Sequence, residues 1–273
     1  MRTAVVGHVE WVRFASVERL PAQGQIITAR ETWIEPAGGG AVAAIRLREL
    51  VGECDFFVAV GNDWAGGRAR EALKLLGLHV HSATRDEPQR RGFTYVDDEG
   101  ERTITLLGPK LHPFGGDPLP WDELDDVDAV YFSAGDVEAL RAARRARVLV
   151  ATARELPTLQ AAGVELDALV HSGTDWAEDY EPGQLDPKPK VVVTTMGREG
   201  GRYVGSDRAG RFAAAELPGP LADAYGAGDS FAAGLTYALG RGDDVERALV
   251  VAAETAASAM TVRGAYGGRT EQG

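Results

Sequence analysis

A glycine-rich stretch, residues 223–231, carries the residue types that could bind and transfer an anion. Gly226, Ala227 and Gly228 are small, and the apolar residues after them recur at helical spacing (Phe231, Leu235, Ala238 and Leu239). The stretch therefore predicts a glycine turn that opens into a buried helix. The first N–H groups of a helix have no internal partner and the helix dipole adds positive potential there, so this turn suits a phosphate.

Asp229 lies among these expected N–H donors, and two roles fit it. It could cap the helix, which is a structural role. It could also act as a base held beside a bound phosphate. Short glycine turns before helices are common, so local chemistry alone favours the cap, and the rest of the chain has to decide.

Composition indicates a globular protein with an acidic surface. The 273 residues are 44% hydrophobic and 26% charged, with a formal net charge of −12. A net negative field does not attract nucleic acid or anionic membranes, so we expect neither as a partner. An anionic ligand would need a local site of hydrogen-bond donors that overcomes this field.

The cysteine content and the first residues of the chain indicate the cellular compartment of the protein. Cys54 is the single cysteine, so no intramolecular disulfide can form, and a small buried hydrophobe is the expected role. The first residues lack the apolar core and cleavage site of a signal peptide, and no run of about 18 apolar residues occurs. We therefore expect a cytoplasmic protein.

Strands and helices alternate along most of the chain. Strands are expected at 3–7, 10–14, 25–29, 56–60, 129–132, 148–151, 168–171 and 191–195, with hairpins at 92–106 and 201–214. Helices are expected at 41–50, 67–76, 137–145, 156–162, after 229 and at 243–260, with a disordered tail after 267. This order predicts one α/β domain over residues 1–273, built on a mostly parallel sheet covered on both faces. Residues 9–36 and 92–107 would add a small β lid.

The order of these pieces resembles the ribokinase family of carbohydrate and nucleoside kinases, also called the PfkB family, over nearly the whole chain. The strongest match is Asp223-Ala-Tyr-Gly-Ala-Gly-Asp229, which is similar to that family's Asp-Thr-x-Gly-Ala-Gly-Asp motif. Weaker matches occur in the expected order at Gly38-Gly39, at 61–67 (Gly-x-Asp-x-x-Gly), at the lid hairpin 98–102 and at 195–200 (Thr-x-Gly-x-x-Gly). With five matches in order, the resemblance makes a cap alone an improbable role for Asp229.

The resemblance implies a three-layer α/β/α sandwich and an ATP-dependent phosphotransferase. Asp229 would be the general base that takes a proton from a substrate hydroxymethyl group as this attacks the γ-phosphate. Gly226, Ala227 and Gly228 would donate N–H groups to the developing negative charge. Such donors would lower the pKa of Asp229 and keep it ionised at neutral pH. ATP and Mg²⁺ are the implied cofactors, and a requirement for a monovalent cation such as K⁺ stays open.

The nucleotide side follows from the same match. Thr195, Gly197, Gly200 and Asp223 would lie along the nucleotide, and Ser172 and Glu254 are further candidates for contacting it. Ser172-Gly-Thr-Asp175 stands where the family usually has Asn-x-x-Glu near the magnesium site. Asp175 is therefore a candidate metal ligand, although a loop or helix cap is nearly as good an account of it.

The substrate side departs from the family. The usual Gly-x-x-x-x-Asp, whose Asp binds sugar hydroxyls, ends at Val12 when counted from Gly7. Glu10 could replace that Asp or could be a solvated strand residue. The usual Asn after the di-glycine is absent, which leaves Gly38 and Gly39 as candidate substrate contacts. Arg91 and its neighbour Arg90 could reach a phosphate or carboxylate of the substrate.

Three functions are consistent with the sequence. The first is a kinase acting on a primary hydroxyl of a sugar or sugar-like molecule, supported by Asp229 and the Gly-Ala-Gly turn. The second is a nucleoside kinase, mildly favoured by lid aromatics at Trp11, Phe14 and Trp33, which could instead pack the lid. The third is a nucleotide- or ligand-binding protein with weak catalysis. A homodimer formed through the lid also stays open.

Overall fold

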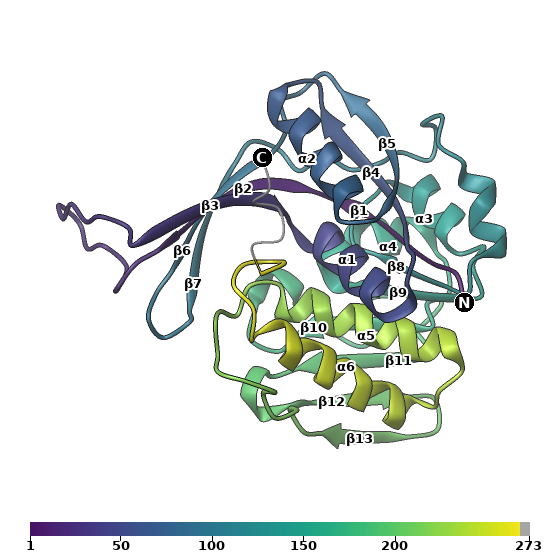
Figure 1. The fold of residues 1–273 in the computed structure, drawn as a ribbon. Coiled ribbons are helices and arrows are strands. Elements are labelled where there is room, and N and C mark those ends of the chain that lie inside the picture. Colours follow the sequence, from purple (N-terminus) through teal and green to yellow (C-terminus); the bar gives the residue numbers. More distant parts are fainter. Residues whose placement is uncertain (268–273) are drawn as a thin grey trace.

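The computed structural model describes residues 1–267, which form two sheets of unequal size (Figure 1). The large sheet has nine strands in the order β13-β12-β11-β10-β9-β8-β1-β4-β5, and a smaller one has the order β3-β2-β6-β7. The strands of the large sheet are β1 (Thr3–His8), β4 (Asp55–Gly61), β5 (His79–Arg85), β8 (Ala129–Phe132), β9 (Val148–Thr152), β10 (Ala168–Ser172), β11 (Val191–Thr195), β12 (Gly201–Gly205) and β13 (Ala209–Phe212). The tail expected to be disordered after Gly267 lies outside the described residues.

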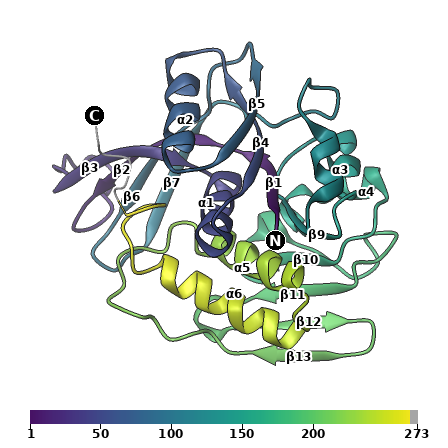
Figure 2. The same ribbon diagram turned by 45° about the vertical axis from the view of Figure 1, so that its right-hand side comes forward.

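Helices cover both faces of the large sheet (Figure 2). On one face lie α1 (Gly39–Val51), α2 (Trp64–Leu75), α5 (Ala227–Arg241) and α6 (Val245–Ala259), and on the other α3 (Val137–Ala143) and α4 (Leu156–Ala162). Successive strand residues point to opposite faces, so Val5 joins the first core while Ala4 and Val6 join the second. The expected three-layer α/β/α sandwich is confirmed. Within residues 1–267, every helix is too short or too polar to span a lipid bilayer.

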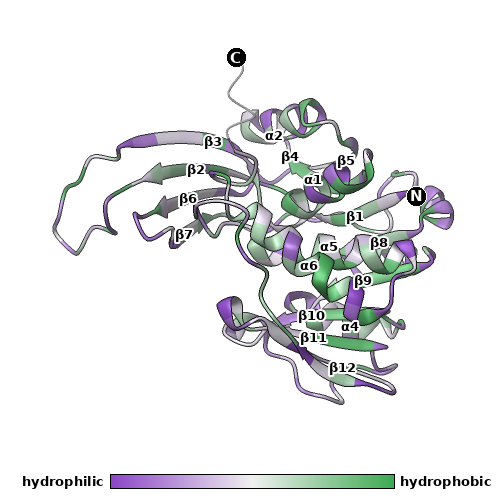
Figure 3. Ribbon diagram, turned by 60° about the horizontal axis from the view of Figure 1, so that its bottom comes forward, coloured by the Kyte–Doolittle hydropathy of each residue, from purple (hydrophilic) through white to green (hydrophobic). Residues whose placement is uncertain are grey.

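The hydropathy of the residues differs between the central sheet and the lid. In Figure 3 the central strands β9 and β11 are mostly hydrophobic, whereas the outer end of the lid carries hydrophilic residues. Strands β1, β4, β8 and β9 are buried along their whole length. This is the pattern of a sheet that helices cover on both faces. The seven strands from β5 to β11 in the sheet order are parallel, and β12 and β13 extend it as an antiparallel edge.

The small sheet is the expected lid. Its strands are β2 (Glu10–Ser16), β3 (Glu31–Ala37), β6 (Arg91–Val96) and β7 (Arg102–Leu107). Phe14 stacks on Trp33 at 5.1 Å between ring centroids and meets the edge of Tyr225 at 5.0 Å. Tyr225 lies in the loop that leads into α5. The aromatic core of the lid is therefore packed directly against the glycine turn.

Two strand predictions differ from the structure. The strand expected at 25–29 is absent, because this segment belongs to an outward excursion of the lid in which Ile26 is 99% exposed. Strand β3 lies later, at Glu31–Ala37, and runs through Pro36, which an edge strand tolerates. Strand β5 was not expected at all. It is an edge strand in which Ala83 is the one buried residue, so its sequence lacks an apolar run.

A buried carboxyl group joins the lid to the C-terminal part of the described chain. Glu35 of β3 is fully buried, and one of its carboxyl oxygens accepts the N–H of Ala265 at 2.6 Å. Burial raises the pKa of Glu35 to about 7, although the N–H of Ala265 opposes the rise. The Arg263 guanidinium lies 4.4 Å from the ring of Trp33 on the same strand. These contacts hold β3 against the turn that also touches the loop before α5.

We expect Glu35→Gln to remove part of the pH dependence of stability. The pKa of Glu35 is about 7 in the folded chain against an ordinary 4.5, so its stabilising effect is full below pH 4.5 and is lost as the pH rises through 7. At pH 8 the free energy of unfolding of Glu35→Gln should exceed that of wild type by about 2–3 kcal/mol, and the gap should shrink towards pH 5. Urea unfolding at both pH values measures this, with the exposed Glu101→Gln as matched control. A gap that is the same at pH 5 and pH 8 would contradict the prediction.

Candidate active site

Two helix N-termini meet beside the glycine turn. Helix α1 follows Gly38 (φ 86°) and helix α5 follows Gly226 (φ 71°), and neither helix has a side-chain cap. Positive φ at both positions is readily adopted only by glycine. The N–H of Gly38 donates to the Tyr225 hydroxyl at 3.1 Å, which holds the two turns together. The starts of the two helices thus lie beside each other, and helix starts are where anions bind. The Ala227 N–H makes a long bond of 3.4 Å to the Ala224 carbonyl.

Asp229 is the third residue of α5, and its side chain points at the start of α1. A side chain on Gly39 would collide with Asp229 Oδ1, so only glycine leaves room for the carboxylate in this position. The structure shows no hydrogen bond to the Asp229 carboxylate from any residue between 1 and 267. Asp229 therefore does not cap α5, and its carboxylate is available for chemistry.

The pKa of Asp229 is raised, not lowered as the sequence led us to expect. Burial raises it to about 6, and the charge of Glu178 adds to the rise, while Arg154 and Arg102 oppose it. The expectation was wrong because the N–H groups of 226–228 do not donate to this carboxylate. Neutral pH is about one unit above this pKa, and at that distance about nine in ten carboxyl groups are ionised. Asp229 is thus mostly a base at neutral pH.

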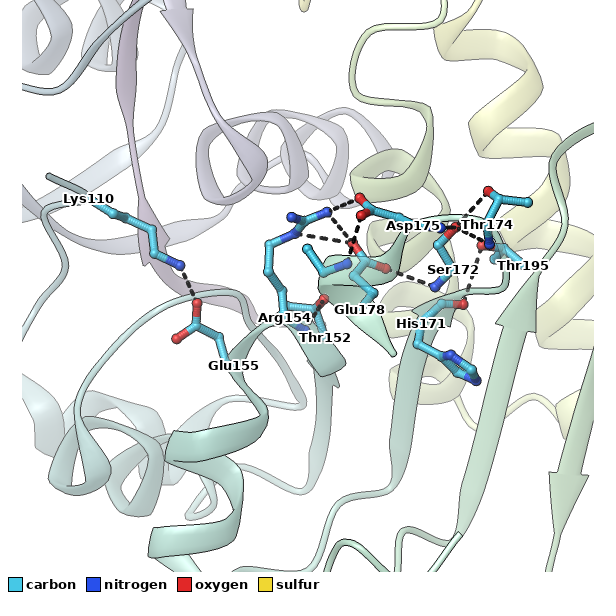
Figure 4. A network of polar contacts seen from close by, with 11 residues as sticks. Lys110, Thr152, Arg154, Glu155, His171, Ser172, Thr174, Asp175, Glu178 and Thr195 are labelled. Carbon is cyan, nitrogen blue, oxygen red and sulfur yellow. Dashed lines mark hydrogen bonds and ion pairs between the residues drawn. The ribbon is translucent and has the colours of Figure 1, made fainter. Parts of the chain in front are cut away.

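Arg154, just after β9, organises the acidic groups near Asp229 (Figure 4). Its guanidinium lies 2.6 Å from Asp175 and 2.7 Å from Glu178. The other oxygen of Glu178 accepts the N–H of Ser172 at 2.8 Å. Neither Arg154 nor Glu178 was singled out in the sequence. Glu178 stands three residues beyond the position at which the acidic residue of the family motif was sought.

Asp175 caps a short 3-10 turn. Its carboxylate accepts the N–H of Ala177 at 3.0 Å and pairs with Arg154, and these contacts lower its pKa, although burial opposes this. The cap that the sequence left open for Asp175 is therefore observed. Together with Ser172 and Glu178 it forms a set of oxygen donors at the carboxyl end of β10.

The motif turn after β11 lies near a cavity next to α6. Thr195 ends β11, and Gly197 (φ 56°) and Gly200 (φ 76°) shape the turn that follows. The backbone of Gly200 packs against residues 212–214. That segment and α6 line a cavity of about 540 Å³, whose wall also includes Glu254. Glu254 therefore lines this cavity directly, whereas the motif turn reaches it only through residues 212–214.

Asp223 shapes the loop before α5. It is buried, and its two carboxylate oxygens accept the N–H of Tyr225 at 2.7 Å and of Gly264 at 2.5 Å. Burial raises its pKa, and the two N–H groups oppose the rise. The observed contacts of Asp223 are therefore with the backbone of its own loop and of the C-terminal turn.

Of the residues expected on the substrate side, Glu10 lies beside the start of α1. Glu10 begins β2, is 4% exposed and packs against Gly38. Arg90 reaches Glu10 at 3.4 Å, whereas the neighbouring Arg91 is exposed. Burial raises the pKa of Glu10, and Arg90 opposes the rise. Of the two arginines considered in the sequence, the structure thus brings Arg90 to the site.

Lys110, a cationic residue that the sequence did not signal, lies near His8 at the end of β1. Lys110 pairs with Glu155 (Figure 4). Burial lowers the pKa of His8 far below its ordinary value, and the charges of Lys110, Arg90 and Arg154 lower it further. His8 is therefore neutral. No local motif marks Lys110, because only the fold brings its segment beside β1.

Comparison with known proteins identifies a family. The sequence model of the pfkB family of carbohydrate kinases matches residues 2–164 and 165–272. The chain is 27% identical to an ATP-dependent ribose-1-phosphate kinase of Halopiger xanaduensis, over 91% of this chain and 88% of that protein. It is 24% identical to a ribokinase of Arabidopsis thaliana, over 96% and 76%.

Solved structures share the fold. A microbiome-derived acarbose kinase superposes with a TM-score of 0.79 at 23% identity, covering 97% of this chain and 94% of that one. The Arabidopsis thaliana ribokinase complexed with ribose and ATP gives a TM-score of 0.71 at 17% identity, covering 100% and 99%. These similarities extend over the lid as well as the large sheet.

We expect the side chain of Asp229 to titrate near pH 6 in the ligand-free protein. The ¹³C carboxyl signals of labelled aspartate measure this, and Asp229→Asn identifies the relevant signal. Because Arg102 holds the pKa of Asp229 down, Arg102→Gln should raise that pKa, whereas Arg91→Gln at an exposed lid position should leave it unchanged. A midpoint below pH 4 would show that N–H donors, not burial, control this carboxylate.

Proposed function

The chain belongs to the pfkB family of carbohydrate kinases, and we propose that Asp229 is the general base with which it phosphorylates a hydroxymethyl group. The enzyme is an ATP-dependent phosphotransferase that acts on a sugar or sugar-like molecule. One observation carries the assignment of the base. The Asp229 carboxylate lies without a hydrogen-bond partner among residues 1–267, between two uncapped helix N-termini.

In the proposed reaction Asp229 first positions the substrate. Its carboxylate accepts a hydrogen bond from the hydroxymethyl group and directs the oxygen at the γ-phosphorus of ATP. As the new O–P bond forms, the bond from the γ-phosphorus to the bridging oxygen breaks, ADP leaves, and the hydroxyl proton passes to Asp229. The N–H groups of Ala227 and Gly228 stabilise the charge on the transferring phosphoryl group.

Mg²⁺ is the metal that fits the donor set near the phosphates. Ser172, Asp175 and Glu178 offer oxygen atoms, which are the ligands that a hard cation prefers, directly or through water. The ion supplies charge neutralisation for the phosphates when it is bound. For the nucleotide, we propose that the turn at Thr195, Gly197 and Gly200 lies along the phosphates. The neighbouring cavity at Glu254 then takes the base.

The substrate end of the pocket favours a polar molecule over an aromatic one. Phe14 and Trp33 are buried in the core of the lid and stack on each other, so they support lid packing rather than a cover for a nucleobase. Glu10 is positioned against Gly38 and supports contacts with hydroxyl groups. Arg90 beside it supports an acidic group on the substrate. Sugars and sugar phosphates are therefore ranked above nucleosides.

A homodimer through the lid is a further proposal. All six residues of β7 are exposed, among them Ile104, Leu106 and Leu107, and β7 is an edge strand. Edge strands with exposed apolar residues tend to pair with another chain. Sedimentation equilibrium should give twice the chain mass at micromolar concentration, and Leu106→Lys should return the protein to a monomer. A wild-type mass equal to one chain would contradict the proposal.

The proposed reaction is tested by ADP formation with a panel of sugars, sugar phosphates and nucleosides. With an accepted compound, Asp229→Asn should lower kcat at least a thousandfold, because proton acceptance and substrate orientation are lost together. ATP binding, measured by calorimetry, should stay within a few-fold of wild type. The exposed Asp207→Asn serves as matched control and should retain full activity.

The possible outcomes separate the functions. Turnover by Asp229→Asn at the wild-type rate would refute the mechanism but not the family. ATP binding without ADP formation on the whole panel would instead favour a ligand-binding protein with weak catalysis. A preference for nucleosides over sugars and sugar phosphates would favour the nucleoside kinase.

A further inference from the structure

A second group of chemically active side chains lies at the opposite end of the large sheet from Asp229. Asp55, His81 and Glu123 each offer one ligand atom, and these three atoms lie within 4.8 Å of one another. Asp55 is the first residue of β4, so it marks the amino end of the parallel strands, whereas the candidate active site uses their carboxyl ends. Within residues 1–267 this is the one group of three or more such side chains in mutual reach.

The pairing of two parallel strands explains how the group forms. In the register of β4 with β5, Asp55 pairs with His79 and Phe57 pairs with His81. Residues two apart on a strand share a face, so both imidazoles follow the same side of β5. His81 Nε2 lies 2.9 Å from Asp55 Oδ1, and His79 Nδ1 lies 3.6 Å from the same oxygen. The ring of Phe57 packs at 4.7 Å from the His81 ring and orients it.

Glu123 completes the group from a separate element. It lies in the 3-10 helix η1 (Trp121–Asp126), which precedes β8. Trp121 of the same helix stacks on Phe57 at 5.1 Å, which fixes η1 over the amino ends of the strands. The Glu123 side chain is 44% exposed, so it is free to rotate towards the other two groups.

We propose that Asp55, His81 and Glu123 bind one divalent transition-metal ion, of which Zn²⁺ is the best match. One imidazole nitrogen with two carboxylate oxygens is a donor set that Zn²⁺ accepts and that Mg²⁺ and Ca²⁺ do not use. Donors bound to one zinc at about 2.0–2.2 Å lie roughly 3.3 Å apart, a spacing that the Asp55–His81 pair nearly has. Water or the nearby His79 takes the fourth position.

The electrostatics of the site suit a cation. The carboxylates of Asp55 and Glu123 supply negative charge, and the metal would take the place of the proton between His81 Nε2 and Asp55. The guanidinium of Arg2 lies 3.5 Å from Asp55 and 3.6 Å from Glu123 and competes with the metal for both carboxylates. These separations are long for hydrogen bonds, so Arg2 is a weak competitor.

The ion would act on stability rather than on phosphoryl transfer. It would join the edge strand β5 to β4 and to η1. Since a ligand that binds only the folded state stabilises it by mass action, bound Zn²⁺ should raise the melting temperature. It should leave the kinetics of the distant active site unchanged.

The proposal is tested with protein freed of metal by a chelator and then titrated with Zn²⁺. The buffer contains millimolar Mg²⁺, which occupies the proposed oxygen-donor site at Ser172, Asp175 and Glu178. Calorimetry should give one Zn²⁺ per chain, and thermal unfolding should shift upward by several degrees. His81→Gln and Glu123→Gln should each weaken binding at least tenfold. Arg2→Gln should tighten binding several-fold, and Asp122→Asn, an exposed neighbour of Glu123, should change nothing.

Two results would contradict the proposed zinc site. Absence of Zn²⁺ binding at 100 µM would overturn the proposal, as would binding that both His81→Gln and Glu123→Gln leave unchanged. Circular dichroism of the metal-free variants establishes that they fold. Should His81→Gln fail to fold, Glu123→Gln decides alone, because its side chain is half exposed and carries little packing. Co²⁺ substitution gives a second readout, since a four-coordinate site produces intense visible absorption that these variants should lose.

Discussion

The convergence of two uncapped helix N-termini on one carboxylate is the constraint on which the rest of the structure depends. Helices α1 and α5 each begin after a glycine with positive φ, and the Gly38 N–H to Tyr225 hydroxyl bond fixes the distance between their ends. Gly39 keeps the space in front of Asp229 free. A side chain on Gly39 would fill the space directly in front of the Asp229 carboxylate.

Buried charge then sets the properties of that carboxylate. Burial and Glu178 raise the pKa of Asp229, and Arg154 and Arg102 hold it near 6. Arg102 belongs to lid strand β7 and donates to the Ala224 carbonyl at 3.0 Å, so the lid contributes to the electrostatics of the base. The packing of Phe14 on Tyr225 joins the same two parts of the molecule. Lid and glycine turn therefore act as one unit around Asp229.

Local patterns predicted the layered architecture and the helix that begins after Gly226. The alternation of apolar strands and helices predicted the layered sheet, because strands buried on both faces have unmistakable apolar runs. Two predictions at the edges of the sheets were wrong. Strand β5 was not predicted because it has one buried residue, and the strand predicted at 25–29 is absent because this segment is exposed. The lowered pKa expected for Asp229 was wrong, since hydrogen-bond geometry decides whether nearby N–H groups reach a carboxylate. Arg154, Glu178 and Lys110 come together only through the order of strands in the sheet, which no local motif encodes.

The central claim is that phosphoryl transfer takes place between the N-terminus of α5 and the Asp229 carboxylate. The most direct measurement is a crystal structure of the enzyme with ADP, aluminium fluoride as a mimic of the transferring phosphoryl group, Mg²⁺ and an accepted sugar. The account predicts fluoride atoms within hydrogen-bond distance of the Ala227 and Gly228 N–H groups and the reacting hydroxyl within hydrogen-bond distance of Asp229. A phosphoryl mimic bound away from the start of α5, or a hydroxyl group that contacts a residue other than Asp229, would contradict it.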